Sequence, residues 1–520
     1  MGFARTLDIL STPTKGIIPL TEKRTTTKVK KRSFIAADRS RLSSSWVTGY
    51  KNINADIRAG RRILMARARD LVINDTYASK AVSMIDKNVL GPSGFTHRNK
   101  AFNLIKKDGK YEREYQQDIN YTINELWKDF CKPDNCFLDE QRSFNENLSA
   151  ILKTIVTDGE MFIVENYTGK YGYQLQGVPS AYCDEMFNKV LGNGNQVVMG
   201  IEYNKVWKPV AYYFKKVTSS DQLYNTDIKD YIRIPADRVY HLYRQNFVGQ
   251  LRGISWFAPS AYRLNIYKSY EEAVLINSRS AAMKTAVLKP KEGVMGETLQ
   301  NPDVASDYEG EENEDGDIVR DISPGEVYVV PDGYDFTSFD PTFPQAEMGS
   351  FSKLILRGFS SGFDLDYPTL SSDHADVNYT SSRSALLDTR LTYKKIQTYL
   401  DDHLLTPVRR KWFEYAALKN KIDIKVKDMD SLNKPEFFGY RGEWVDQYKE
   451  NNADALALEK GLETHTQILG KRGYNFEEFI EQVKYEKETL AEAGIVFSPM
   501  PVQPILIDDQ EGKKGAKTNA

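Results

Sequence analysis

The chain has 520 residues, with 70 Lys and Arg against 72 Asp and Glu and a formal net charge of −2. This balance excludes a protein that coats nucleic acid over its whole surface, and an apolar fraction of 41% excludes wholesale disorder. Three cysteines are too few for a disulfide framework, and every apolar run falls far short of the ~20 residues of a transmembrane helix. We therefore expect a protein with reduced thiols that assembles in the cytoplasm, away from membranes.

Residues 1–44 are predicted to form a basic, flexible arm. Eight Lys or Arg stand between Lys23 and Arg41 against a single acid, Asp38. Such a run favours an anionic partner, either nucleic acid or an acidic protein face, and a solvated tail without a partner is the alternative. The candidate contacts in this arm are Lys28, Lys30, Lys31 and Arg32.

Residues 45–258 show the pattern of an α+β domain. Apolar residues at helical spacing run through 54–90. Asn74 and Asp75, residue types that cap helix N-termini, interrupt this pattern, and Gly91 with Pro92 ends it. Short strands with turns between them follow from Glu160 onward. Two more helices are expected at about 111–131 and 144–158, and single strands are expected at 160–167, 196–204 and 231–243, among others.

A helix–insert–helix unit is predicted next. An uninterrupted helix is expected over 259–288, and its partner over 345–363. The insert 289–344 carries an acidic stretch at 307–317, whose glycines do not fit a calcium-binding loop, so we interpret it as solvated. Two helices that leave a body and return need neighbours to cover them, and a closed ring would supply those neighbours.

The rest of the chain is predicted to be mainly helical. Pro368 disfavours helix in 364–380, which is expected to form a polar loop. A helix over 381–418, interrupted by Pro407, opens the region 381–449, which also holds a strand near 422–428. Region 450–495 is expected to contain two helices, 453–470 and 475–493, and 496–520 is expected to be a tail.

Two common enzyme signatures are absent from the sequence. The phosphate-binding GxxxxGK[ST] loop and the HExxH zinc motif do not occur. The group that looks most catalytic is His374 between Asp373 and Asp376, but neighbouring residues on a loop point in different directions. We therefore expect no catalytic residue, metal ligand or cofactor, and we interpret this group as a polar loop tip.

Several blocks in the correct order resemble the portal proteins of tailed bacteriophages, lambda-type family. The most specific block spans 355–390, where Asn378, Tyr379 and Arg383 match the family pattern. The acidic insert and the basic arm have no counterpart in this resemblance. The other matching blocks are 54–94, 156–167, 200–214, 234–259 and 445–488.

The resemblance implies a portal fold of wing, helical stem, α/β clip and helical crown. Twelve subunits would form a ring at one capsid vertex of the virion, the channel for DNA packaging and ejection. The implied partners are double-stranded DNA, the large terminase, a head-completion or adaptor protein, and the major capsid and scaffold proteins. The implied parts are wing 45–258, stem 259–288 and 345–363, clip 289–344, tunnel loop 364–380, spine helix and wing strand 381–449, and crown 450–495. The alternative is a packaging nuclease or ATPase, but a Walker loop or carboxylate cluster is missing.

The same resemblance makes 364–380 the candidate DNA-channel segment. Its apex would be Ser371, Ser372, Asp373 and His374. Its base would be Asp364, Asp366, Asn378, Tyr379 and Arg383. We expect Arg383 to pair with Asp364 or Asp366 at this base. The apex is expected to contact DNA weakly, because serine, aspartate and histidine do not grip phosphate.

Overall fold

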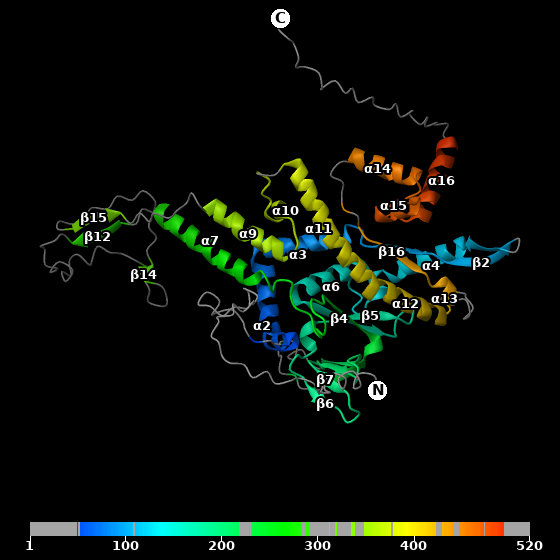
Figure 1. Cartoon of the computed structure of the whole chain (residues 1–520), viewed down its shortest axis with the longest axis horizontal. Helices are drawn as coiled ribbons and strands as arrows, with labels where there is room; N and C mark the ends of the chain where they lie inside the picture. The colour runs from blue at the N-terminus through cyan, green and yellow to red at the C-terminus, as the bar shows by residue number, and fades with distance from the viewer. Residues whose placement is uncertain are drawn as a thin grey trace, which may run out of the picture. The chain divides into compact units, whose positions relative to one another are not determined.

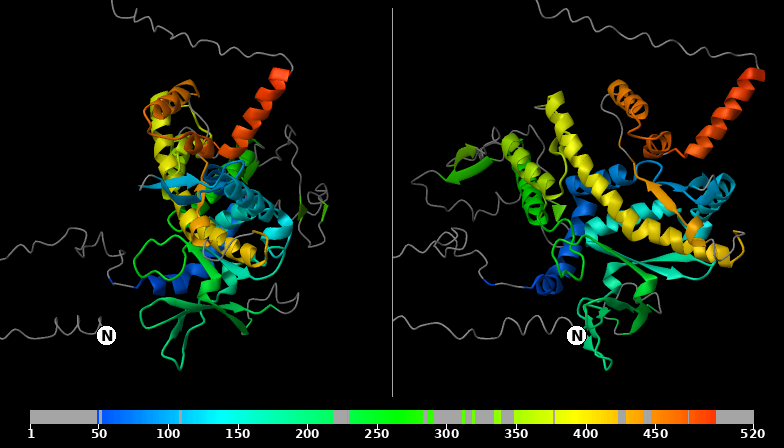
Figure 2. Two further views of the ribbon diagram at one scale, coloured as in Figure 1. Left: turned by 90° about the vertical axis from the view of Figure 1, so that its right-hand side faces the viewer. Right: turned by 45° about the vertical axis from the view of Figure 1, so that its right-hand side comes forward.

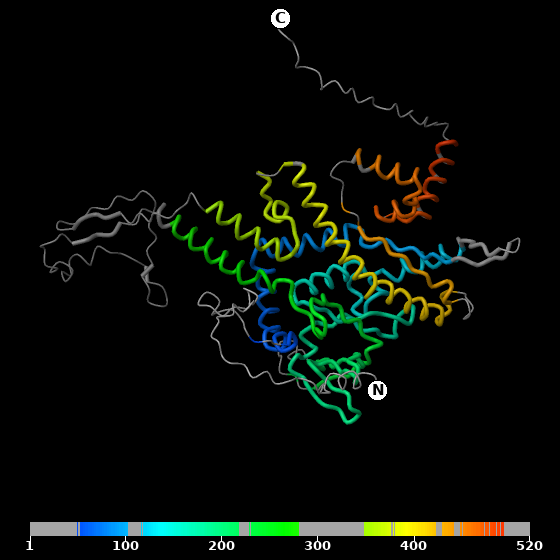
Figure 3. Tube along the Cα trace, viewed as in Figure 1, coloured from blue at the N-terminus to red at the C-terminus, as the bar shows by residue number. Residues whose placement is uncertain are grey.

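The computed structural model describes most of the chain between Asn52 and Glu492 (Figure 3). The arm 1–44, most of the insert 289–344 and the tail 496–520 lie outside the described residues, so their predicted character is untested. The described ranges are 52–107, 110–217, 230–282, 286–290, 311–312, 318–319, 334–338, 348–375, 378–422, 429–440, 447–472 and 474–492, with single residues 49, 228 and 442.

The first two helices confirm the predicted interruption. Helix α2 covers Ile53–Asn74 and α3 covers Thr76–Leu90. Asp75 caps α3, its carboxylate accepting from the Ala78 amide at 2.8 Å, so one of the unpaired first-turn amides gains a partner. Gly91 ends α3 with φ of 69°, a left-handed conformation that favours glycine.

The next helical stretch begins later than predicted. The segment 111–116 is not helical, because β3 (Lys110–Tyr115) pairs antiparallel with β2 (Phe102–Lys107), and its backbone bonds are satisfied across the hairpin. Helix α4 covers Gln117–Phe130, the one-turn helix α5 covers Pro133–Cys136, and α6 covers Phe144–Asp158. Ser143 and Glu146 form a capping box that starts α6 where predicted.

The strands form two main antiparallel sheets. The three-stranded sheet has the order β11–β4–β5, and the five-stranded sheet has the order β10–β9–β8–β7–β6. Two single strands were predicted wrongly: 196–204 and 231–243 each hold two strands, because Gly200 turns the first back and Pro235 starts a 3-10 turn in the second. The bounds are β4 Glu160–Asn166, β5 Gln174–Val178, β6 Lys189–Val190, β7 Gln196–Val198, β8 Ile201–Tyr203, β9 Pro209–Lys215, β10 Tyr231–Pro235 and β11 Val239–Tyr243.

Two hydrophobic cores hold these elements together. In the larger core, helix α6 packs on β4 and against α2 and α3 (Figures 1 and 2). Trp127 and Trp412 make an edge-to-face contact there, with ring centroids 5.2 Å apart. The smaller core fills the space between the two sheets around Phe162, whose ring meets Tyr212 and Phe214.

The helix–insert–helix unit is present with a shorter first helix. Helix α7 covers Ala261–Ala282 and packs beside α9, Met348–Gly362 (Figure 1). Residues 286–288 of the predicted helix belong instead to strand β12 (Ala286–Pro290), because the backbone there pairs antiparallel with β15 (Tyr334–Ser338). Strand β13 (Glu311–Glu312), inside the acidic stretch, pairs with β14 (Ile318–Val319), which directly follows the stretch.

The long helix after 378 is interrupted at the predicted proline. Helix α11 covers Tyr379–Leu400, a π-helical turn covers Asp401–Leu405, and α12 covers Thr406–Leu418. Pro407 has no amide hydrogen to donate, and the wider turn in front of it accommodates that loss. Residues 423–428 of the predicted strand lie outside the described residues. After them come α13 (Met429–Leu432) and β16 (Pro435–Phe438), which pairs with β1 (Thr96–Asn99).

The C-terminal region has three helices where two were predicted. Helices α14 (Gln447–Glu459), α15 (His465–Lys471) and α16 (Phe476–Glu492) make up this region. Gly461, with φ of 68°, and a capping box at Thr464 divide the first predicted helix. Across the described parts of the chain, every helix is too short or too polar to span a membrane. The α+β class is therefore confirmed, with these corrections to its elements.

Candidate functional site

The segment 364–380 is more ordered than the predicted loop. A short helix, α10, covers Tyr367–Ser371, and the carboxylate of Asp366 caps it by accepting from the Thr369 amide at 3.1 Å. Pro368 lies in the first turn, where its missing amide hydrogen is not needed, so it is compatible with this helix. Residues 376 and 377 lie outside the described residues.

The predicted apex residues lie against the chain's own helices. Ser372, at the end of α10 with φ of 60°, accepts a hydrogen bond from the ammonium of Lys80 on α3. The carboxylate of Asp373 accepts from the Tyr367 hydroxyl at 3.1 Å and lies 3.3 Å from Lys353 on α9. The Ala375 amide, with Tyr367 and Lys353, lowers the pKa of Asp373.

The other apex side chains differ in their environment. Ser371 donates to the Tyr367 carbonyl at 2.8 Å, while His374 is exposed. Sequence reasoning did not identify Lys80 and Lys353, because each lies on a different helix from its partner and no local motif marks it. The apex is therefore a polar surface whose one carboxylate already faces an ammonium group.

The predicted base residues are held by different partners from those expected. Asp364, with φ of 55°, lies 3.8 Å from Arg244, and the Asp366 carboxylate caps α10. Asn378 is the N-cap of α11, its side chain accepting from the Ser381 amide at 2.8 Å. Arg383 is half-buried one turn further on. The side chain of Tyr379 lies outside what the structure describes.

A buried ion cluster joins α2 to the three-stranded sheet. Glu160 on β4 is fully buried and faces Arg252 (Nε at 2.9 Å), Arg61 (2.9 Å) and His241 (3.1 Å). Burial alone would raise the pKa of the Glu160 carboxyl, but the two guanidinium groups and His241 hold it well below its usual value. Arg61, Glu160 and the pair His241 and Arg252 come from three separate parts of the chain, so no spacing predicted the cluster.

Helices α7 and α9 expose apolar side chains on the face that their own packing leaves open. On α7, Leu264 and Tyr267 are buried, whereas Tyr262, Ile266 and Ile276 are 77%, 48% and 59% exposed. Successive residues turn by about 100° around a helix, so these three exposed side chains form one stripe opposite the buried face. On α9, Leu354 is 65% exposed, whereas Phe351, 41% exposed, contacts the Tyr270 ring of α7 with centroids 5.0 Å apart.

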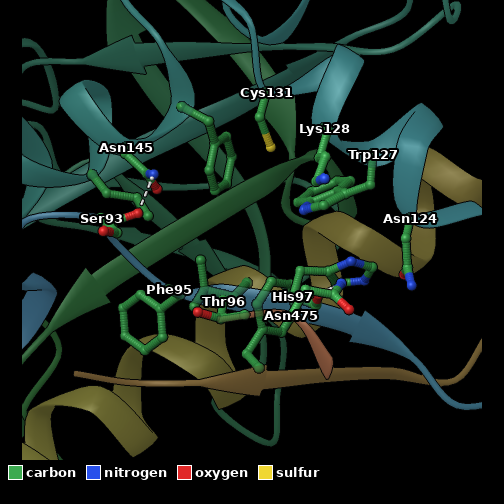
Figure 4. Close-up of a pocket in the computed structure, with 14 residues that line it drawn as sticks. Ser93, Phe95, Thr96, His97, Asn124, Trp127, Lys128, Cys131, Asn145 and Asn475 are labelled. Atoms are coloured by element: carbon green, nitrogen blue, oxygen red, sulfur yellow. Dashed lines mark hydrogen bonds between the residues drawn. The ribbon is translucent and has the colours of Figure 1, made fainter. Parts of the chain in front are cut away.

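A cavity of about 260 Å³ lies between α4, α6 and β1 (Figure 4). His97, Trp127 and Cys131 line it, and the Asn145 amide donates to the Ser93 carbonyl at 2.9 Å on its far side (Figure 4). Burial, together with the Arg409 charge, lowers the pKa of His97, and burial raises that of Cys131 well above its usual value. A neutral thiol and a neutral imidazole in this arrangement are packing groups.

A second cavity, of about 670 Å³, lies beside the base of the segment. Asp364, Arg244, Trp256, Lys395 and His403 contribute to its walls. Within the described part of the chain, no three His, Cys, Asp or Glu side chains gather in a way that could hold a metal ion. The arrangement as a whole offers polar and apolar contact surfaces and buried structural charges.

Comparisons with known proteins agree with the resemblance read from the sequence. The family model "Phage portal protein, lambda family" matches residues 39–397. A probable portal protein of Halomonas phage phiHAP-1 is 29% identical over 89% of this chain and 88% of its own length. Portal protein B of Escherichia phage lambda is 19% identical, over 87% of this chain and 88% of its own.

Among solved structures, a chain in the neck of a native GTA particle gives a TM-score of 0.43 with 13% identity, covering 79% of this chain and 97% of that one. The family match spans well over half of the 520 residues and includes the α2–α3 pair, both sheets, the α7 and α9 helices and most of α11. The chain belongs to the lambda family of phage portal proteins.

Proposed function

We propose that copies of this chain close into a ring of about twelve at one capsid vertex and form the channel through which DNA is packaged and ejected. The family match over 39–397 carries this proposal. Portal proteins are architectural, and the role that follows from the family is passage of DNA. Assembly would take place in the host cytoplasm and the ring would remain in the virion.

The apolar stripe on α7 supports assembly into a ring. Tyr262, Ile266 and Ile276 extend along a 22-residue helix, about 33 Å long, whose opposite face is already packed. Contiguous exposed apolar surface usually marks a protein–protein contact. When the same stripe meets a different face of the next copy, the contact is heterologous, and a constant rotation closes it into a ring.

The parts of the ring follow from the family. The wing would comprise 45–258, the stem α7 and α9, and the clip the insert with β12 and β15. The spine helix and a wing strand would occupy 381–449 and the crown 450–495. The clip would dock the terminase during packaging and the head-completion protein afterwards, and the arm 1–44 would contact DNA or capsid and scaffold proteins.

The segment 364–380 would line the channel with the apex Ser371–His374. Its charges suit weak contact with DNA, because the Asp373 carboxylate is balanced by Lys353 and the remaining apex side chains are uncharged or weakly basic. A channel wall that binds phosphate tightly would slow the passage of DNA, since each phosphate contact adds affinity.

The experiment is a count of subunits and symmetry. Twelve chains of 59.4 kDa give a particle of about 700 kDa, which native mass spectrometry and electron-microscopy class averages of the purified protein can identify. Ile266→Asp places a charge on the exposed stripe and should reduce ring formation. Leu418→Asp, at a side chain 71% exposed at the end of α12, is the matched control and should assemble normally. A wild-type chain that stays monomeric at micromolar concentration would refute the proposal.

A further inference from the structure

One end of the five-stranded sheet carries two adjacent turns, 191–195 between β6 and β7 and 204–208 between β8 and β9. The register places Val190, Gln196, Tyr203 and Pro209 in successive strands at this end. A side-chain carbon built on Gly194 would lie 3.3 Å from Lys205, so the two turns touch. Residues 189–195 and 204–208 are termed the hairpin tip, which points away from the helices (Figures 1 and 2).

The second turn is built rigidly by Asn204. Its side-chain oxygen accepts from the amides of Val206 and Lys208, each at 3.0 Å, and its backbone carbonyl accepts from the Trp207 amide at 3.0 Å. This turn holds Trp207 at φ of 61°. A left-handed conformation is costly for a bulky side chain, and such outliers cluster at functional positions.

The side chains displayed by this tip are apolar and exposed. Val190 and Val206 are each 76% exposed, and Trp207 is 57% exposed. The Trp207 ring meets only Tyr203 among the described aromatic rings, at 5.7 Å between centroids. A fixed turn that presents an exposed tryptophan beside two valines has the composition of an interface anchor, because a rigid aromatic side chain loses little entropy on binding.

The charge of the tip is positive. Lys189, Lys205 and Lys208 are exposed, and none of them forms an ion pair with another described residue. The acid nearest in the strands, Glu202, is buried and already bound to Arg233 at 2.8 Å.

We propose that the hairpin tip is a docking surface for an acidic protein surface of the capsid shell, with Trp207 seated in an apolar depression and the three lysines facing carboxylates around it. This inference rests on the proposed function for the choice of partner. The two exposed valines favour a protein over DNA, because a phosphate backbone offers nothing for them to bury. Complementary charge would speed the encounter and fix its orientation.

The test measures binding of the assembled full-length protein to the purified major capsid protein of the same phage by biolayer interferometry. Trp207→Gly should bind about 30-fold more weakly or worse, the loss typical of an anchor residue. Its thermal midpoint should equal or exceed that of the wild type, because glycine adopts the left-handed conformation without strain. If Trp207 only stabilised the fold, its replacement would lower the thermal midpoint together with the affinity.

Two further variants complete the design. Lys205→Glu with Lys208→Glu should weaken binding at low salt, and the difference from wild type should shrink as salt is raised. Tyr474→Ala removes an aromatic side chain of similar exposure, 60%, and should bind as the wild type does.

Several results would overturn the docking surface. The first is that Trp207→Gly binds capsid protein as tightly as the wild type does, and the second is that the wild type does not bind capsid protein. The third is that the tip variants change ring assembly or the affinity for duplex DNA instead. A wild-type chain that binds capsid protein through the tip but forms no ring would refute the proposed function while supporting the docking surface.

Discussion

Replacing Glu160 by glutamine should destabilise the sheet region more than any comparable change nearby. The carboxylate is the closest anionic partner of both Arg61 and Arg252, which are 3% and 0% exposed. Glutamine keeps the shape and can accept one hydrogen bond, but it leaves two buried cations without their main counter-charge. The next carboxylate, Glu185, lies 3.8 Å from Arg61. Breaking one partner of a buried ion pair costs about 3–5 kcal/mol.

This free energy can be measured by hydrogen exchange at β4, where the cluster is anchored. A loss of about 3–5 kcal/mol corresponds to roughly 100- to 4,000-fold faster exchange for amides that open with this region. The matched control is Glu165→Gln on the same strand. Glu165 is also fully buried, but its carboxylate accepts from the hydroxyls of Tyr173 and Tyr240. Loss of the Glu165 charge therefore leaves no buried cation without its counter-charge.

The control should cost only about 1–3 kcal/mol, the penalty for an impaired buried hydrogen-bond group. Equal acceleration of exchange in the two variants would show that burial of a polar group, and not the unpaired guanidinium charges, sets the cost. Unchanged exchange in Glu160→Gln would refute the reasoning altogether, because it would mean that water or a rearranged Glu185 already solvates both cations.

Two other predictions follow from the same geometry. Burial lowers the pKa of His97 and His241, so both contribute stability above the ordinary histidine pKa of 6.5, and this stability is lost as the pH falls below it. The thermal midpoint should therefore drop between pH 7 and pH 5, and the drop should be smaller in a variant that carries both His97→Gln and His241→Gln. Identical pH profiles of the wild type and this variant would contradict the lowered pKa of the two histidines. Replacing Ser371–His374 by glycine should leave ring assembly intact and lower the length or retention of packaged DNA. Gel electrophoresis of DNA extracted from the particles measures both. Full-length, stably retained genomes in this variant would show that the apex has no role.

The elements whose signals are local could be predicted from the sequence by itself. Asp75 and Ser143 start helices because their side chains bond the first free amides, and that chemistry needs no distant partner. Pro407 interrupts a helix because it lacks an amide hydrogen. The family resemblance was visible for a similar reason, since ordered blocks of residues carry it.

Only the tertiary structure decided the elements that depend on distant partners. Residues 111–115 and 286–288 were predicted to be helical but belong to strands, because each segment pairs with another strand and the cross-strand bonds outweigh a weak helical preference. Asp373 faces Lys353, and Glu160 faces Arg61 and Arg252, across separations that no spacing rule reaches. Charge pairing at Asp373 and at Glu160 is a property of the packed helices and sheets, because their arrangement brings the partners within bonding distance.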